Sequence, residues 1–329
     1  MPALRSPFEP PAFWRSEDIT GTDDWSVQFS DLERDEIIAA VRSATEGQIT
    51  VASITAADFP LPSLSARLSE WSQQLNLGRG FLLLRGFPIE HLSDEEIELA
   101  YVGLGAHLGT PVGQDRDATL LGHVRDEGIE RVDPSVRFYR TKERQDFHTD
   151  GADLVALLCL HRAVRGGESR IASSAAVYNE ILRTRPDLLE VLYEPFCWDR
   201  NNEQSAGEAP FFELPVCNDV NGVPRFFYIG WYIRDAQRHP EVPRLTDEQH
   251  EALALVESIA NDPAVHLEME FQPGDIQLLN NARMLHARAA YEDSGNPAER
   301  RHLLRLWLAA HDFTGVDDLL NQGIPQQQL

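Results

Sequence analysis

The amino-acid sequence predicts a fold of the α+β class with a mainly β core, a barrel or jelly roll wrapped by helices. Three observations lead to this prediction. From Thr119 onward, short strand-like runs follow one another between turn-forming residues. Only two helical segments interrupt these runs, so strands and helices do not alternate as they do around a parallel sheet. Residues 1–78 are instead mainly helical, and no repeat of fixed period is visible.

The N-terminal extension, residues 1–78, and the segment that follows it hold the first predicted helices. Their apolar spacing places them over 31–45, 64–77 and 93–108, and Ser93-Asp94-Glu95-Glu96 opens the third. Between the second and the third helix, the apolar run 80–88 is bounded by glycine and proline. This run predicts a short buried strand.

The β core is expected to span residues 79–310, with a tail over 311–329. Strands are predicted over 120–124, 153–160, 211–217, 223–229, 266–271, 276–279 and 302–309. An insert around 175–265 holds two helices, over 175–193 with a break at Pro186 and over 246–260, which Thr246 and Gln249 open as a capping box. We expect one domain over 1–329, whose insert forms a lid or a wall of the substrate site.

The composition excludes several classes of partner. The chain has 29 Lys and Arg against 53 Asp and Glu, a net charge of −24, which argues against nucleic acid and anionic membranes. Its 42% apolar and 25% charged residues are typical of a globular protein. The cysteines, Cys159, Cys197 and Cys217, fit neither a zinc motif nor a disulfide framework. With no readable signal peptide and no membrane-length apolar run, we expect a cytoplasmic protein, compatible with a homo-oligomer.

Common catalytic motifs do not explain the sequence. It contains no GxSxG elbow, no Walker A loop and no HExxH helix. The glycines of 103–109 resemble a dinucleotide loop, but the last is one place late and the segment lies within a predicted helix. Serine hydrolases, P-loop NTPases and zincins are therefore excluded, and helix packing explains these glycines better.

Three His-x-carboxylate pairs could supply metal ligands: His148 with Asp150, His239 with Glu241, and His266 with Glu268. The second straddles Pro240 in a loop-like stretch, and the third is expected on the solvent face of a strand. The first leads directly into the strongly apolar run 153–160. We therefore favour His148 and Asp150 as a site, although a simple hydrogen-bonded His-Asp pair remains open.

A third ligand has to come from elsewhere in the chain, and His286 is the candidate. It follows a predicted turn and strand that begin at Pro273, and it precedes the strand that carries Arg301 and Arg305. Both arginines share one face of that largely apolar strand. Two guanidinium groups there are costly unless an anion or an acid pairs with them. A structural pair at the rim of the sheet, with Asp or Glu partners, is the alternative.

At these residues the sequence resembles the TauD/TfdA (taurine catabolism dioxygenase) family of iron(II)- and 2-oxoglutarate-dependent dioxygenases. The resemblance runs from about Gly80 to Leu308. Its motifs, in order, are Gly80 to Phe87, Phe147-His148-Thr149-Asp150, Gly166-Gly167-Glu168-Ser169, Pro273-Gly274-Asp275, Asn281 to His286 with Arg288, and Arg301-His302-Leu303-Leu304-Arg305. Each motif is short, but their order and spacing together are specific.

The resemblance implies a double-stranded β-helix, a cupin-like jelly roll, as a single dioxygenase domain. It also implies that His148, Asp150 and His286 hold Fe(II) as a facial triad, with positions left for 2-oxoglutarate and dioxygen. The far carboxylate of 2-oxoglutarate would bind an arginine, Arg301 or Arg305, with help from Ser169. Which arginine does so stays open, because the other could bind the near carboxylate or an acidic group of the substrate.

The activity that the resemblance implies is oxidation of an unactivated C–H bond of a small metabolite, while 2-oxoglutarate becomes succinate and CO2. Asp150 occupies the position where related halogenases carry a small residue, so hydroxylation is favoured over halogenation. A small amino or carboxylic acid suits a spare arginine, and a natural-product intermediate is equally compatible. Desaturation or ring formation on the same scaffold, a cupin-like metal hydrolase or isomerase, and a non-catalytic metabolite-binding protein are the alternatives.

Overall fold

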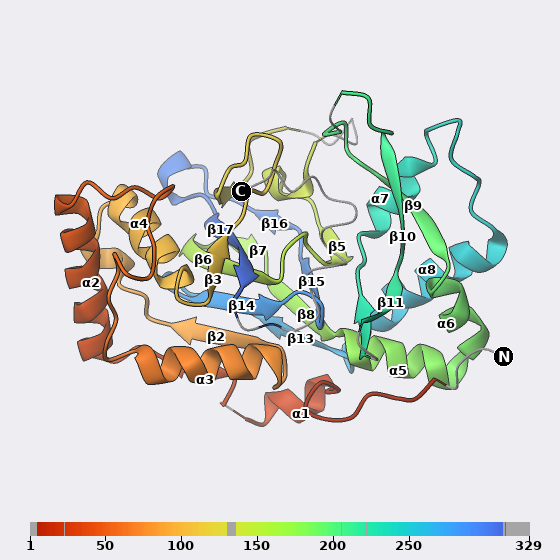
Figure 1. The fold of residues 1–329 in the computed structure, drawn as a ribbon, viewed down its shortest axis with the longest axis horizontal. Helices are drawn as coiled ribbons and strands as arrows, with labels where there is room; N and C mark the ends of the chain where they lie inside the picture. Colours follow the sequence, from red (N-terminus) through yellow and green to blue (C-terminus); the bar gives the residue numbers. More distant parts are fainter. Residues whose placement is uncertain are drawn as a thin grey trace.

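Two β-sheets form the centre of the protein (Figure 1). The computed structural model describes residues 5–22, 24–129, 136–204, 206–220, 223–311 and 313. The seven-stranded sheet has the order β1-β2-β14-β6-β17-β3, with β4 also paired to β17. Its strands are β1 (Ser26–Gln28), β2 (Phe81–Arg85), β3 (Gly109–Pro111), β4 (Leu121–Val124), β6 (Leu154–His161), β14 (Ile276–Asn280) and β17 (His302–Ala310). The four-stranded sheet, β13-β8-β15-β5, consists of β5 (Gln145–His148), β8 (Ser169–Ser173), β13 (His266–Met269) and β15 (Met284–Arg288).

The two sheets face each other across a shared apolar interior. Phe81, Val155 and Trp307 of the larger sheet pack there with Ile171 and Leu267 of the smaller one. Side chains alternate along each strand, so the neighbours of these residues point outward to a second layer. This two-sheet sandwich confirms the predicted jelly-roll core of the α+β class.

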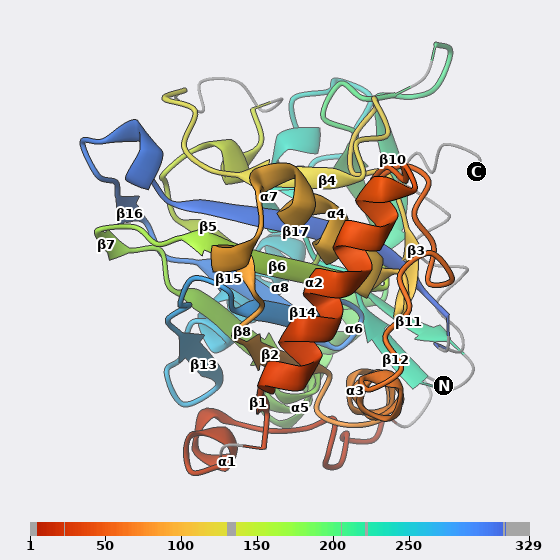
Figure 2. The ribbon, with the colours of Figure 1, turned by 90° about the vertical axis from the view of Figure 1, so that its left-hand side faces the viewer.

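Helices cover the outer face of the larger sheet (Figures 1 and 2). They are α2 (Asp31–Glu46), α3 (Ser65–Asn76) and α4 (Asp94–Gly105), at the predicted places, while the short α1 (Ser16–Thr20) lies near β13. Ser30 and Ser93 cap α2 and α4 as capping boxes. Leu82 and Leu84 of β2 pack against these helices, whereas Phe81 and Leu83 face the interior. The run 80–88 is therefore apolar throughout because both of its faces are buried.

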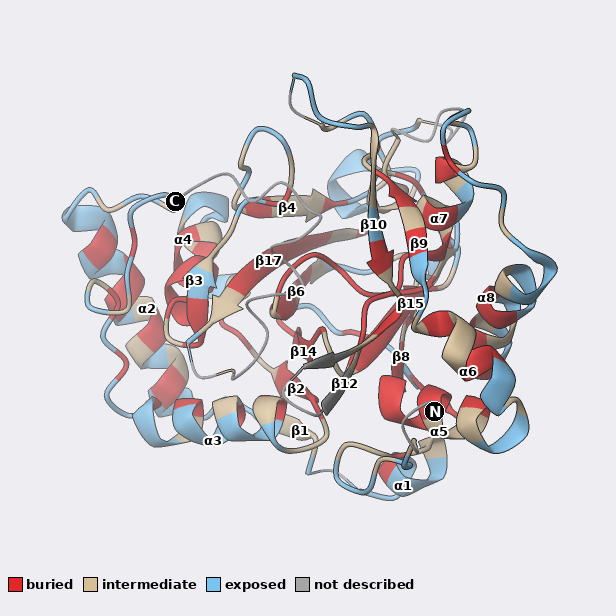
Figure 3. Ribbon diagram, turned by 45° about the vertical axis from the view of Figure 1, so that its right-hand side comes forward, coloured by how far each residue is buried: buried red, intermediate tan, exposed pale blue. Residues whose placement is uncertain are grey.

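The insert covers the outer face of the smaller sheet. Its helices are α5 (Ser174–Thr184), α6 (Pro186–Leu192), α7 (Gly230–Ala236) and α8 (Asp247–Ala260), and its strands are β9 (Pro195–Asp199), β10 (Phe211–Pro215), β11 (Cys217–Val220) and β12 (Val223–Phe226). Phe147 and Leu285 of the sheet share one apolar cluster with these elements. Buried positions accordingly run from the sheets into the insert, while the outer helix faces are exposed (Figure 3).

Short elements complete the fold. They are β7 (Arg165–Gly166), β16 (Tyr291–Glu292) and the 3-10 helices η1 (Ile89–His91), η2 (Phe138–Arg140) and η3 (Pro297–Glu299). Of the predicted tail, 311–329, only His311 and Phe313 belong to the described residues. No helix in the described part of the chain is both long and apolar enough to cross a membrane.

The structure differs from the sequence-based prediction in several places. The predicted strand 211–217 is two strands that separate at Val216, and the predicted strand 223–229 ends at Phe226 before α7 begins. His266, expected on a solvent face, is buried. Its Nδ1 lies 3.1 Å from the carbonyl oxygen of Ala260, because the end of α8 covers this side of β13. Burial lowers the pKa of His266.

A tight turn before β14 provides a test of the fold. Gly274 has φ +85°, and a Cβ there would lie 2.7 Å from the carbonyl oxygen of Phe87. We expect Gly274→Ala to lower the free energy of unfolding by about 1–3 kcal/mol, because it adds strain and a clash. Urea unfolding measures this loss, and Gly295→Ala, with nothing within 4 Å of its Cβ, is the control. Equal stability of the two variants would contradict the prediction.

Candidate active site

Two histidines meet on the smaller sheet. The strands β5 and β15 are antiparallel, and His148 lies directly opposite His286. Opposite residues of an antiparallel pair project to the same side of the sheet. The centres of the two imidazole rings are 4.1 Å apart, and both side chains are buried. Strand pairing therefore brings together residues that are far apart in the sequence.

Asp150 follows β5 by two residues and turns back toward both rings. Asn281 fixes its backbone, because the amide of Asp150 donates to Asn281 Oδ1 at 2.7 Å and Asn281 Nδ2 donates to the carbonyl of Asp150. The carboxylate lies 3.8 Å from Nε2 of His148 and 3.7 Å from Nε2 of His286. Among the described residues, these three form the only cluster that could hold a metal, with ligand atoms within 4.8 Å of one another.

The state of the two imidazoles suits a divalent metal. Nδ1 of His148 lies 2.8 Å from the carbonyl oxygen of Asp146, which can only accept, so Nδ1 carries the proton and Nε2 keeps its lone pair. The amide of Gln145, 2.9 Å away, donates to that Nε2. Nδ1 of His286 is buried and bonds to none of the described residues. Two neutral imidazoles and one carboxylate are the donor set of non-haem iron sites, so these residues fit Fe(II).

The electrostatics of the cluster keep the histidines neutral and the aspartate charged. Burial, and then repulsion from His286 when it is protonated, lower the pKa of His148 to about 3. Burial also lowers the pKa of His286. For Asp150, burial opposes ionisation, but Arg305, and the two histidines when they are protonated in acid, outweigh it and lower the pKa to about 2. All three groups are thus in the protonation state that a metal requires.

This neutral state of His148 predicts acid sensitivity of the metal-free protein. Its pKa is about 3 when folded and 6.5 when unfolded, so between these values only the unfolded chain takes up the proton. Stability therefore falls as the pH falls through this window, by about 2 kcal/mol from pH 7 to pH 5. Urea unfolding with a chelator measures this loss. In His148→Gln, the loss of stability between pH 7 and pH 5 should be smaller by about 2 kcal/mol. An identical pH dependence of the two proteins would disprove the role of His148.

Arg305 of β17 lies directly beside the cluster. Its Nη1 is 3.4 Å from Oδ2 of Asp150, to which Nε1 of Trp307 also donates, at 3.0 Å. Its guanidinium carbon lies 4.7 Å from the ring centres of both Tyr139 and Trp307. Nε donates to Oε1 of Gln114 at 2.7 Å. Arg305 is therefore fixed on several sides and acts on Asp150.

Arg301 directly precedes β17 and lines a smaller cavity of about 40 Å³, together with Ser169, His286 and Arg305. Its Nη1 is buried and bonds to none of the described residues. Its Nη2 has only a long contact, 3.5 Å, with the carbonyl oxygen of Gly167. The hydroxyl of Ser169 donates to Oε1 of Gln277 at 3.1 Å. A buried guanidinium with an unused donor at a cavity suits a carboxylate ligand.

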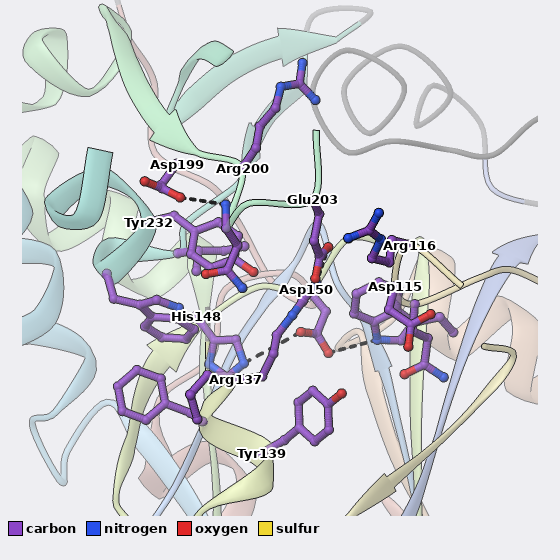
Figure 4. A pocket seen from close by; sticks show the side chains of 18 of the residues that line it. Asp115, Arg116, Arg137, Tyr139, His148, Asp150, Asp199, Arg200, Glu203 and Tyr232 are labelled. Carbon is purple, nitrogen blue, oxygen red and sulfur yellow. Dashed lines mark hydrogen bonds and ion pairs between the residues drawn. The ribbon is translucent and has the colours of Figure 1, made fainter. Parts of the chain in front are cut away.

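A larger cavity of about 200 Å³ opens on the other side of His148 and Asp150 (Figure 4). The insert and the segment before β5 form most of its walls. Besides His148 and Asp150, its charged and aromatic lining residues are Asp115, Arg116, Arg137, Phe138, Tyr139, Asp199, Arg200, Glu203, Phe212, Trp231, Tyr232, Arg305 and Trp307. The ring of Trp231 lies 4.9 Å from that of His148, centre to centre. The insert thus supplies a wall of the cavity next to the triad.

The other two His-x-carboxylate pairs do not join this cluster. His239 lies 2.8 Å from Oδ2 of Asp199, in a separate network, and His266 faces α8. Sequence reasoning did not identify Gln114, Tyr139 or Arg137 as site residues, because they lie outside any periodic element. Trp307 had a usable signal, since it shares the strand face of Arg305.

Comparisons with known proteins agree with this geometry. Residues 41–307 match the family model described as "Taurine catabolism dioxygenase TauD, TfdA family". FR-33289 synthase of Streptomyces rubellomurinus (strain ATCC 31215) is 32% identical over 93% of this chain and 91% of its own length. The taurine hydroxylase-like protein SAT17 of Stachybotrys chartarum is 31% identical over 89% of this chain and 77% of its own.

Solved structures show the same fold at low sequence identity. An asparagine oxygenase in complex with Fe(II), 3-hydroxyasparagine and succinate has a TM-score of 0.66 at 16% identity, over 86% of this chain and 93% of that one. The non-haem iron oxygenase OrfP with iron and alpha-ketoglutaric acid has a TM-score of 0.64 at 16% identity, over 87% and 94%. The chain belongs to the TauD/TfdA family and is an iron- and 2-oxoglutarate-dependent oxygenase of a small metabolite.

Proposed function

We propose that His148, Asp150 and His286 hold Fe(II) and that the protein hydroxylates a small acidic metabolite while it converts 2-oxoglutarate to succinate and CO2. The observation that carries this proposal is the position of the buried triad between two cavities. One contains the unused guanidinium donor of Arg301, and the other is large enough for a small metabolite. His148, Asp150 and Arg305 line both cavities, so both ligands would reach the same metal.

We assign the far carboxylate of 2-oxoglutarate to Arg301. Arg305 is already engaged by Gln114 and Asp150 and lies next to the triad. Arg301 directly precedes β17, lines the smaller cavity but not the larger one, and contacts none of the three triad residues. Ser169 lines the same small cavity and would add its hydroxyl. A planar guanidinium suits this role because it binds a carboxylate with two parallel hydrogen bonds.

The protein would contribute to the reaction by fixing the metal ligands and by shaping the pocket around them. Iron with 2-oxoglutarate supplies the oxygen activation that C–H oxidation needs. Asn281, Trp307 and Arg305 fix Asp150, and the carbonyl of Asp146 fixes the tautomer of His148. The rings of Trp231 and Tyr139 line the cavity beside the triad, so its wall near the metal ligands is partly aromatic.

The substrate is proposed to be a small amino or carboxylic acid, or another acidic metabolite. Four arginines and four carboxylates line the larger cavity, in a chain where acidic residues outnumber basic ones by 53 to 29. A relative from Amycolatopsis, 24% identical over 67% of this chain, is named a uridine-5'-phosphate dioxygenase, and its substrate carries an acidic group. We further propose a cytoplasmic location, which Cys159 and Cys197, both outside any disulfide, support, and a single catalytic domain over 1–329.

Succinate formation tests the proposed function. The purified protein, loaded with Fe(II), is incubated with 2-oxoglutarate, oxygen and pools of small acids, and succinate and oxygenated products are measured by mass. We expect slow succinate formation alone and faster formation with the right pool, with a product heavier by one oxygen atom. No succinate under any condition, or turnover with zinc in place of iron, would instead favour a metal hydrolase or isomerase.

A further inference from the structure

The larger cavity has an ion pair in its wall. Nη2 of Arg137 lies 2.5 Å from both carboxylate oxygens of Glu203 (Figure 4). The side chains are only 18% and 22% exposed, so the pair is largely withdrawn from water. Arg137 directly precedes η2, and Glu203 lies in the irregular segment between β9 and β10. The pair therefore does not belong to any regular element that it could stabilise.

Stability alone explains this pair poorly. Taking two charges out of water is costly, and apolar side chains of similar size often give equal or greater stability. Apolar partners are available, since Phe138, Phe212 and Trp231 line the same cavity. A buried ion pair in the wall of a cavity beside an active centre is more typical of a ligand site.

The charge distribution favours a negatively charged ligand. The cavity is lined by four arginines and four carboxylates, whereas the whole chain has 29 basic against 53 acidic residues. Two of these carboxylates are already matched outside the cavity or at the metal site. Asp199 accepts from Arg238 and His239, each at 2.8 Å, and Asp150 belongs to the triad. With equal numbers of arginines and carboxylates, the cavity is more positive than the chain as a whole, which favours an anion.

We propose that Arg137 binds an oxyanionic group of the substrate, a carboxylate or a phosphoryl group, and that Glu203 is its counter-ion in the absence of substrate. This inference rests on the proposed function, which places the substrate in this cavity. The Glu203 carboxylate demonstrates that two oxygens fit at this guanidinium. Both hydrogen bonds to Glu203 use Nη2, and a guanidinium carries further N–H groups on Nε and Nη1 that can donate to an incoming anion.

The location of Glu203 allows its carboxylate to move away from Arg137 when the substrate anion binds. Its segment has no strand or helix, and the backbone amide of Glu203 donates only to the carbonyl of Arg200, at 2.9 Å. Its displacement therefore breaks no sheet or helix hydrogen bond, and its carboxylate can turn to solvent. With the anion at Arg137, the rest of the substrate would lie between Trp231 and the triad, where the aromatic wall suits an apolar chain.

Two substitutions with opposite expected effects test the proposal. Enzyme loaded with Fe(II) and saturating 2-oxoglutarate is titrated without oxygen, by calorimetry, with propionate, propylphosphonate and the neutral propionamide. We expect Arg137→Gln to weaken binding of the acids at least about 10-fold and Arg137→Lys to weaken it less. Glu203→Gln should tighten it, because the competing carboxylate is removed. Propionamide binding should not respond, and Arg183→Gln, which breaks an exposed pair with Glu180, is the control.

The outcomes separate this inference from the proposed function. Tighter binding of either acid identifies the anion as carboxylate or phosphoryl, and both results support the proposal. Weaker acid binding in Glu203→Gln, or no preference of the wild type for acids over propionamide, would overturn it. Succinate formation after oxygen is admitted reports the proposed function independently. Succinate without Arg137-dependent acid binding rejects only the inference, whereas no succinate rejects the function itself.

Discussion

Replacement of His286 by alanine is expected to abolish stable iron binding and turnover. The imidazole lies opposite His148 and 3.7 Å from Asp150, so its loss leaves two ligands in the cluster. Two ligands hold a divalent ion far more weakly than three, and we expect an affinity loss of more than about 100-fold. Metal analysis after anaerobic dialysis measures bound iron, and succinate formation measures turnover.

The fold should survive this substitution. His286 contributes no hydrogen bond from Nδ1 to the described residues, so alanine leaves no partner unsatisfied there. Removal of a ring at this buried position should cost only the free energy of a small cavity. His250→Ala, on the exposed side of α8, is the matched control and should bind iron normally. Full iron occupancy in folded His286→Ala would remove His286 from the ligand set.

The sequence was most informative where one short segment determines the outcome. Ser93 and Glu96 predicted the start of α4, and Pro186 predicted the break between α5 and α6, because caps and proline act within a few residues. The expected solvent exposure of His266 was wrong because the end of α8, only six residues earlier, folds back over this side of β13, which strand alternation does not reveal. The helix α7 was missed because Phe226 to Tyr232 is aromatic and β-branched, a composition that favours strands.

The same distinction between local and long-range information applies to the residues of the site. His148 and Asp150 could be selected because a buried strand follows them, and Arg301 and Arg305 because they share a strand face. The pairing of β5 with β15, which sets His286 against His148, depends on contacts between distant segments that no local period encodes. The choice between the two arginines needed their contacts, since only Arg305 touches Asp150. Arg137 and Glu203 lie in loops, where sequence patterns carry little positional information.

Arg301→Gln is expected to raise the KM for 2-oxoglutarate at least about 30-fold, since loss of one partner of a desolvated charge pair costs about 2–5 kcal/mol. The variant should fold, because the side chain of Arg301 has only a 3.5 Å contact with Gly167 and a cation–π contact with Tyr291 to lose, and its Nη1 is unused. Iron binding should be retained, as Arg301 does not contact the triad. In Arg305→Gln, the main effect should instead fall on iron affinity, through Asp150.

A co-substrate analogue makes this assignment specific to the far carboxylate. 2-Oxopentanoate has the same chain length as 2-oxoglutarate but lacks that group, so the wild type should strongly prefer 2-oxoglutarate. In Arg301→Gln the preference should largely disappear, because the enzyme no longer has the cation that distinguishes the two acids. Arg301→Lys should recover part of it, since a point charge replaces the bidentate fork. A preference that persists in Arg301→Gln and disappears in Arg305→Gln would transfer the role to Arg305.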